Sequence, residues 1–189
     1  MPHFSSAVRT TDYTIWETLF DELRKEVLIM NGVSRMTVCE DVALVTFHKV
    51  PNELSLITKI FTEFAKAQIN LDMISQTAPQ GHFIDISFTL PSDQLMKVLE
   101  LAGKFREMHS ALKPMISNGN CKLQLYGEEM KTMYGVAASA IEAIAETNVE
   151  LALITTSEVD ISLLVTQPHC SEAIESLVKT FKVKAEYLV

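Results

Sequence analysis

The sequence repeats itself at an offset of 80 residues, and this repeat is the strongest constraint on its fold. When residues 54–77 are laid over residues 134–157, the coincident apolar positions include Ile60 on Ala140, Phe64 on Ile144 and Ile69 on Val149. After a shortening by five residues, Asp85-Ile86-Ser87 falls on Asp160-Ile161-Ser162. A duplicated supersecondary unit is therefore expected.

The second copy shows which unit is duplicated. Apolar residues alternate with polar or small ones over residues 149–154 and again over 161–165, which predicts two strands joined by a turn at 155–158. A helix is predicted before them at 135–147 and another after them at 171–181, while 123–126 and 183–189 are strand-like. The order βαββαβ is that of a ferredoxin-like α+β unit.

The first copy is predicted to contain the same elements. Its predicted strands cover residues 33–39, 42–47, 69–75 and 83–90, with a tight turn at Glu40-Asp41, and its predicted helices cover 54–66 and 94–105. Residues 108–119 contain Pro114 and the turn-forming Ser117-Asn118-Gly119, so we expect a linker there. Each copy is expected to form its own four-stranded sheet.

An apolar stripe precedes the first copy. Trp16, Phe20, Leu23 and Val27 recur at helical spacing within residues 12–30, which predicts an N-terminal helix. Its stripe either packs on its own domain or docks on a partner subunit. The expected division is an N-terminal helix or arm at 1–31, a first domain at 32–110 and a second at 111–189.

Composition excludes several classes of protein. The net charge is −8, with 16 basic and 24 acidic residues and no Lys or Arg cluster, so neither nucleic acid nor an anionic membrane is an expected partner. Three widely spaced cysteines argue against a disulfide framework or a structural metal site. No apolar run approaches the roughly 18 residues of a membrane span, and no secretory signal is visible. We expect a soluble, cytoplasmic protein.

The sequence contains no recognisable catalytic motif. Phosphate-binding glycine loops, a nucleophile elbow and zinc-binding histidine pairs are all missing, and the five histidines are scattered. No catalytic residue, metal ligand or cofactor is therefore predicted, and binding is the expected activity. Gly135 either lets a ligand approach the backbone or only relieves a tight turn. Asp72 and Gln76 either bond a small amino acid or are solvated residues at a strand end.

Two groups of motifs resemble the ACT domains of aspartokinases. In the second copy the resemblance is carried by Gly127-Glu128-Glu129-Met130, by Gly135-Val136-Ala137-Ala138 and by residues 154–165. In the first copy it is carried by Val50-Pro51-Asn52, by residues 69–76 and by Asp85-Ile86-Ser87-Phe88-Thr89. Together these motifs extend over about residues 31–181. The chain thus resembles the tandem ACT regulatory region of aspartokinases, without the kinase domain.

The resemblance implies a function. ACT domains of this family bind lysine, threonine or a related amino acid at the interface between domains, usually within a dimer. We therefore expect an allosteric, amino-acid-binding regulatory protein that forms a homodimer and is not an enzyme. The alternative is a non-catalytic subunit that associates with an aspartokinase-like catalytic chain.

The resemblance also assigns an effector site. The implied effector-binding residues are Asn52, Ser55, Leu56, Asn70, Asp72, Gln76, Met130, Gly135, Val136, Ala137 and Asn148. Those of the first copy are expected to face those of the second. Asn52 and Ser55 stand where the family has Asp and Gly, which removes one charge-assisted bond to a ligand and one position of close approach.

Overall fold

The structure is a computed structural model that describes residues 32–188, so the predicted helix at 12–30 lies outside the described residues. Within them the chain forms one seven-stranded sheet in the order β2-β3-β1-β4-β6-β5, and β7 pairs with β1. The strands are β1 (Arg35–Pro51), β2 (Asp72–Gln76), β3 (Phe83–Pro91), β4 (Pro114–Tyr126), β5 (Leu151–Thr156), β6 (Asp160–Thr166) and β7 (Ala185–Leu188). The α-helices are α2 (Leu54–Lys66), α3 (Leu95–Met108), α4 (Val136–Ala145) and α5 (Cys170–Phe181).

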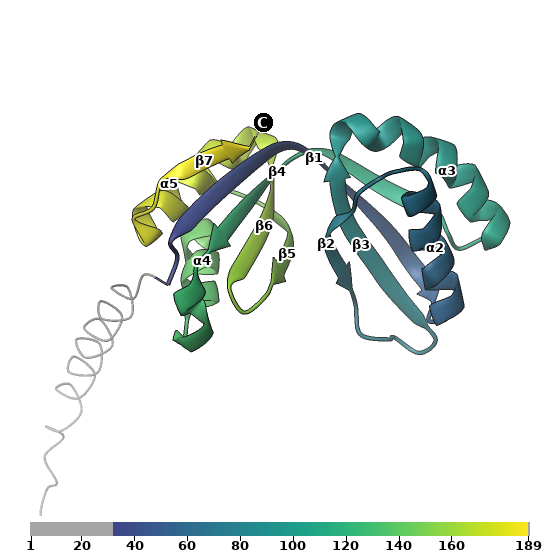
Figure 1. The fold of residues 1–189 in the computed structure, drawn as a ribbon, viewed down its shortest axis with the longest axis horizontal. Coiled ribbons are helices and arrows are strands. Elements are labelled where there is room, and N and C mark those ends of the chain that lie inside the picture. Colours follow the sequence, from purple (N-terminus) through teal and green to yellow (C-terminus); the bar gives the residue numbers. More distant parts are fainter. Residues whose placement is uncertain (1–31, 189) are drawn as a thin grey trace, which may run out of the picture.

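The duplicated α+β fold is confirmed. Each half of the molecule contains two helices that cover one face of its part of the sheet (Figure 1). We call residues 42–120 the first half, and residues 32–39 and 121–188 the second half. In the first half the strands lie in the order β2-β3-β1-β4, which is the order of a ferredoxin-like unit.

The prediction of two separate sheets was wrong, because β1 and β4 each run through both halves. They pair antiparallel from Arg35 opposite Tyr126 to Phe47 opposite Pro114. The predicted turn at Glu40-Asp41 is a bulge inside β1: Asp41 has a φ of 54°, and the register with β4 shifts there. A second irregularity lies close by in β4, where Gly119 has a φ of 72°. The predicted linker therefore shrinks to the short segment before β4.

The fourth strand of the second half comes from β1. Residues 35–39 lie beside β4, on the side opposite β6. The predicted closing strand does form, as β7, but it pairs parallel with β1 at Met36–Cys39 because the place next to β4 is already occupied. Residues 32–39 were expected in the first domain, but residues 35–39 pair with β4 and β7 of the second half. The boundary at 110/111 stays a prediction.

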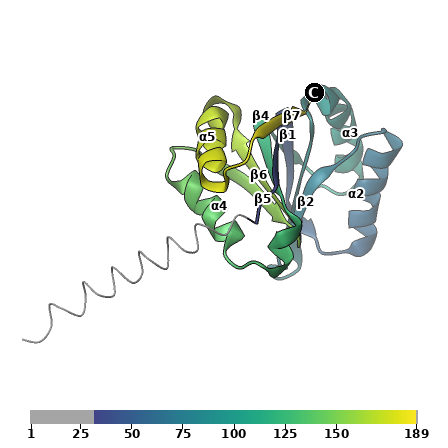
Figure 2. The ribbon, with the colours of Figure 1, turned by 60° about the vertical axis from the view of Figure 1, so that its left-hand side comes forward.

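Two hydrophobic cores lie under the two helix pairs. One contains Phe47, Phe64, Phe88 and Phe105 beneath α2 and α3, and the other contains Val33, Met36 and Val38 together with β4, β6, α4 and α5. The two helix pairs lie on the outer sides of the molecule, and the sheet surfaces between them face each other (Figures 1 and 2). Within residues 32–188, no helix is both long enough and apolar enough to cross a bilayer.

A small third cluster joins the halves, and we call it the seam cluster. Val42 of β1, Met73 of β2 and Leu164 of β6 are buried together, with Cys39, Leu44 and Leu153 packed against them. Near this point Asn120 donates from Nδ2 to the carbonyl oxygens of Val42 (3.1 Å) and Ser117 (3.2 Å). The seam cluster and this amide together fix the region where β1 and β4 cross between the halves.

Candidate functional site

The N-terminus of α2 is the first part of the predicted site. The helix begins after Glu53, which makes no side-chain capping bond, and Asn52 lies one position before this N-cap residue. The backbone N–H of Asn52 donates instead to the carbonyl oxygen of His82 at 2.9 Å. Asn52 and Ser55 are exposed, whereas Leu56 is buried in the core of the first half. Uncapped N–H groups at the start of a helix suit a carboxylate.

Strand β2 is the second part. Asn70, Asp72 and Gln76 are all exposed. Asp72 accepts a hydrogen bond from the backbone N–H of Met73 (2.8 Å) and forms an ion pair with Lys122 of β4, at 2.5 Å between Nζ and Oδ2. Because β2 lies at an edge of the sheet, its outer backbone groups have no partner strand within residues 32–188.

The predicted residues of the second half lie around α4. Gly135 is the exposed N-cap residue of this helix and has a φ of 84°, a conformation that requires glycine, so the turn itself explains this residue. Met130 and Val136 are buried in the core of the second half, and Ala137 packs against that core. Asn148 is exposed between α4 and β5. The side chains of Met130 and Val136 therefore serve packing.

The structure does not bring all these groups together within one chain. Asn52 and Ser55 lie at the start of α2, whereas Asn70 and Asp72 follow its end, and thirteen helical residues span about 20 Å. Gly135 and Asn148 are separated in the same way by α4. Helices α2 and α4 themselves lie on opposite outer sides of the molecule (Figures 1 and 2). The first-half residues therefore do not face those around Gly135.

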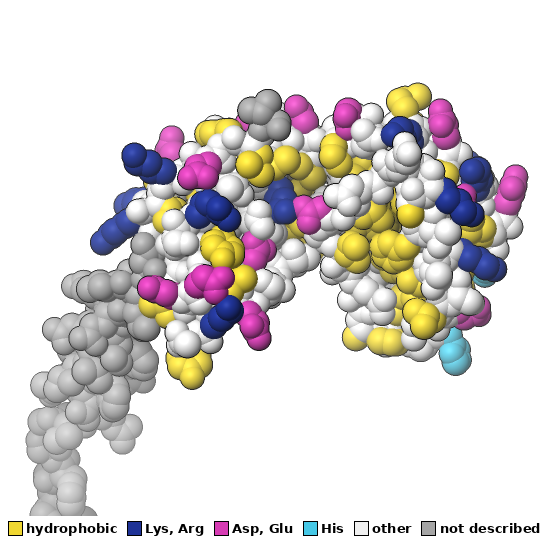
Figure 3. All heavy atoms as spheres, in the orientation of Figure 1, with side chains coloured by type: hydrophobic (Ala, Val, Ile, Leu, Met, Phe, Trp, Pro, Cys, Tyr) yellow, Lys and Arg dark blue, Asp and Glu magenta, His cyan; other side chains and the backbone are white. Residues whose placement is uncertain are grey.

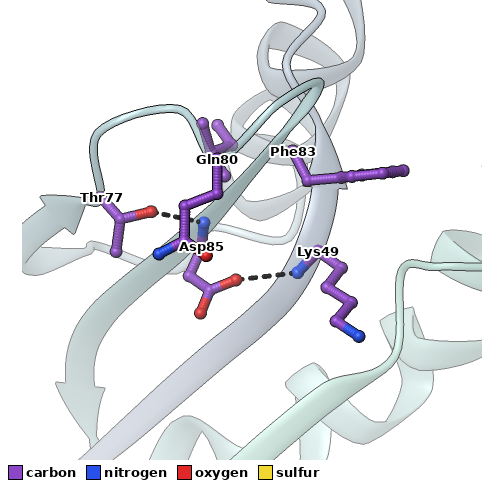
Figure 4. A pocket seen from close by; sticks show the side chains of 6 residues that line it. Lys49, Thr77, Gln80, Phe83 and Asp85 are labelled. Carbon is purple, nitrogen blue, oxygen red and sulfur yellow. Dashed lines mark hydrogen bonds between the residues drawn. The ribbon is translucent and has the colours of Figure 1, made fainter.

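A pocket of about 180 Å³ opens at the start of β3 in the first half, lined by Lys49, Thr77, Gln80, Phe83, Ile84 and Asp85. None of the predicted effector-binding residues lines it, although Thr77 follows Gln76 directly. Figure 4 shows Asp85 between two strands: its Oδ1 accepts the backbone N–H of Lys49 at 2.8 Å, and its own N–H donates to Thr77 Oγ1 at 2.9 Å. The Lys49 side chain also lines this pocket.

Asp85 is held firmly at this pocket. A bulge in β1 gives Lys49 a φ of 52°, and it turns both the Lys49 N–H and the ring of His48 toward the carboxylate, with His48 Nδ1 at 2.8 Å. The Lys49 N–H and then the His48 contact lower the pKa of the Asp85 carboxyl. Asp85 was not among the predicted site residues. The repeat offered a signal for it, because an aspartate, Asp160, occupies the equivalent position of the second copy.

The described residues show neither a metal-binding group nor an activated thiol at Cys121 or Cys170. No group of three or more His, Cys, Asp or Glu side chains in residues 32–188 could hold a metal ion. Cys121 and Cys170 are buried, and burial is the main cause that raises the pKa of each thiol, so neither is an activated nucleophile. The uncapped start of α2 and the exposed carboxylate of Asp72 are each suited to reversible binding.

Comparison with known proteins agrees with this picture. Residues 123–181 match the sequence model of the ACT domain. An aspartokinase from Bacillus sp. (strain MGA3) is 27% identical over 156 residues, which cover 82% of this chain and 37% of that protein. The chain spans about 37% to 43% of the length of the curated aspartokinases that it matches.

Solved structures show the same fold. The regulatory subunit of aspartate kinase from Thermus thermophilus, in a ligand-free form, superposes with a TM-score of 0.73 at 23% identity, covering 79% of this chain and 99% of that one. Aspartate kinase from Synechocystis superposes with a TM-score of 0.78 at 26% identity, covering 84% of this chain and 28% of that one. The chain therefore resembles the ACT-domain regulatory region of aspartokinases.

Proposed function

We propose that this chain is a non-catalytic regulatory protein that binds a free amino acid of the aspartate family, such as lysine or threonine. The observation that carries the proposal is that the first half presents both an uncapped helix start, at Asn52 to Ser55, and an exposed carboxylate, Asp72. The helix start suits the carboxylate of an amino acid, and Asp72 suits its ammonium group.

A second copy of the chain completes the site. The helix start and Asp72 lie at opposite ends of α2, about 20 Å apart, which is too far for one small amino acid. If two copies meet along α2 and β2 about a twofold axis, the start of α2 in one copy lies beside Asp72 of the other. Each dimer then has two equivalent sites, with Asn70 and Gln76 near the side chain of the ligand.

The surface of the first half supports this dimer. Leu54 and Ile74 are 77% and 54% exposed, and Ile57, Phe61 and Leu71 beside them are only partly buried. Figure 3 shows hydrophobic side chains gathered on the visible side of this half, over the region of β2, β3 and α2. An apolar surface beside an unpaired strand edge is what a subunit interface requires.

The alternative is a regulatory subunit that associates with a separate catalytic chain. It is favoured by the fold comparison in which this chain covers 99% of a protein described as a regulatory subunit of aspartate kinase. Purification of the tagged full chain from its source, followed by identification of stoichiometric partners, tests this alternative. A co-purifying aspartokinase-like chain supports it, and recovery of the homodimer alone contradicts it.

Thermal unfolding of the full chain with a panel of amino acids tests the main proposal. A ligand at 100 times its Kd should stabilise the protein by about 2.7 kcal/mol. Asp72→Asn should lower the affinity for this ligand at least about tenfold, because it removes a charge-assisted hydrogen bond. Glu107→Gln, a neutralised carboxylate on the exposed surface of α3, should bind normally. A panel that produces no shift contradicts the proposal.

The proposed interface has its own test. Ile74→Glu places a charge in the surface between the copies, so light scattering should show a monomer and the ligand response should be lost. Met96→Glu is the matched control, since Met96 is a 67% exposed hydrophobic residue on α3, outside that surface. A dimer that survives Ile74→Glu with full ligand binding places the site elsewhere.

A further inference from the structure

Strand β2 is irregular where it meets the second half. Asp72 lies opposite Thr89 and Ser75 lies opposite Ser87, so β2 has one residue more than β3 in this interval. Met73 has a φ of 45°, which side chains other than glycine rarely adopt, and its N–H is held by Asp72 Oδ1. A bulge with such a strained residue is kept only where surrounding contacts fix it.

Two of the contacts that fix this bulge come from the other half of the molecule. The side chain of Met73 is 4% exposed and is buried in the seam cluster against Leu164 of β6. The Oδ2 atom of Asp72 pairs with Nζ of Lys122 on β4. Lys122 and Leu164 are themselves direct partners in the sheet. Two successive residues of β2, Asp72 and Met73, thus contact two neighbouring side chains of the second half.

The ion pair is shielded on one side only. The Lys122 side chain is 15% exposed, whereas that of Asp72 is 55% exposed. A cation can therefore reach Asp72 from solvent without crossing the seam, but it then shares the carboxylate with Lys122. Two cations at one carboxylate repel each other, so an incoming ammonium group and Lys122 compete for it.

We propose that the β2 bulge is a latch between the two halves, and that the ligand of the site proposed above opens it. This inference rests on the proposed function in so far as the ligand presents an ammonium group to Asp72. Binding of that group displaces Lys122, removes the ionic contact that holds the bulge, and loosens the packing of Met73 in the seam cluster. Occupancy of the site is thereby transmitted to β4 and β6.

Removal of the competing cation tests the latch. In the full-length chain, Lys122→Met should bind the amino acid about twofold to fivefold more tightly by calorimetry, the range expected from one partly exposed ion pair. Lys104→Met is the control: it removes an ion pair of 3.5 Å with Glu63 from α3, outside the proposed interface, and should leave the affinity unchanged. Unchanged or weaker binding by Lys122→Met overturns the proposal.

A measurement without ligand tests the latch independently of which amino acid binds. Hydrogen exchange of residues 151–156 and 160–166 should be at least about threefold faster in Asp72→Asn and in Lys122→Met than in the wild type and Lys104→Met. The double variant Asp72→Asn, Lys122→Met should exchange no faster than either single variant. If both single variants exchange at the wild-type rate, the latch is overturned. If they exchange faster but no amino acid of the thermal-unfolding panel binds, only the proposed function is overturned.

Discussion

The two halves fill the same fold with different side chains. In the first half Phe47, Phe64, Phe88 and Phe105 form a connected aromatic cluster, with ring centroids 4.9 to 6.2 Å apart. The core of the second half contains only one phenylalanine, Phe181, and takes its volume from aliphatic, sulfur-containing and alanine side chains. A βαββαβ unit therefore does not prescribe its core residues, provided that the total volume is filled.

The difference extends to the contacts between the helices. In the second half Ala140, Ala143 and Ala173 are buried, and Ser176 Oγ of α5 donates to the carbonyl oxygen of Ala143 on α4 at 2.6 Å. In the first half α2 and α3 are linked by an ion pair between Glu63 and Lys104, at 3.5 Å. Small side chains let a side chain of α5 reach the backbone of α4, whereas α2 and α3 meet through larger side chains, including the rings of Phe64 and Phe105 at 5.3 Å between centroids.

Phe88→Ala should give the largest loss of stability. Phe88 is fully buried, and its ring packs near Phe47, Phe61 and Phe64. The cavity should cost about 3 to 5 kcal/mol of unfolding free energy, measured by urea denaturation. Because β1 and β4 belong to both halves, unfolding should remain one transition.

Leu163→Ala is the matched variant, because the repeat places Leu163 over Phe88 and Leu163 is also fully buried. Its cost should be about 2 to 5 kcal/mol, again in one transition. Two separate transitions in either variant would show that the halves unfold independently in spite of their shared strands.

Exchanging residues at one repeated position tests the packing difference directly. Ile60 and Ala140 coincide in the repeat, and both are fully buried. Ile60→Ala should cost about 2 to 5 kcal/mol through a cavity, and Ala140→Ile should cost about 1 to 3 kcal/mol through overpacking. Chemical denaturation measures both values. If Ala140→Ile is neutral, α4 is packed more loosely than its alanines indicate.

Gly127→Ala should destabilise the second half by about 1 to 3 kcal/mol or more. A Cβ atom at Gly127 would lie 1.7 Å from the carbonyl oxygen of Gly32, so the backbone that enters β1 has to move. Calorimetric unfolding measures the loss. Gly103→Ala is the control, since a Cβ there meets nothing within 4 Å and lies in α3, and it should stabilise the protein by about 0.5 to 1 kcal/mol.

Local patterns predicted the helices and most strands, because these depend on periodicity that each segment carries itself. The bounds predicted for α2 agree with the structure. The hairpin of β5 and β6 overlaps both predicted strands, although β5 runs two residues into the predicted turn and β6 extends to Thr166. The continuity of β1 could not be predicted in this way. A polar pair such as Glu40-Asp41 is compatible with a turn and with a bulge. Only the pairing of β1 with β4, which is distant in sequence, decides between the two.

The candidate site was predictable as a set of residues but not as an arrangement. Motif order identified Asp72, yet its partner Lys122 lies 50 positions further along the chain and shares no local pattern with it. The spacing of Asn52 and Asp72 in sequence likewise conceals that they lie at opposite ends of a helix. These relations arise from tertiary packing.

Asp85→Asn should have the smallest effect, and it should appear as a pH dependence. The Lys49 N–H and His48 lower the pKa of the folded-state Asp85 carboxyl, so its stabilisation is present above the unfolded pKa of about 3.9 and is lost as the pH falls through the folded-state pKa. Since the side chain is 39% exposed, solvent screening should keep this contribution below about 1 kcal/mol. Urea denaturation at pH 7, 5, 4 and 3 measures it.

The wild type should therefore lose more stability than Asp85→Asn below about pH 4, and the two should run parallel above about pH 5. In the second half, the matching Asp160 accepts hydrogen bonds from the neutral side chains of Gln124 and Ser162. Added salt should reduce the difference at Asp85, because part of it comes from the charge on His48. Parallel loss from pH 7 to 3 would mean that the bulge in β1 holds this carboxylate no more strongly than water does.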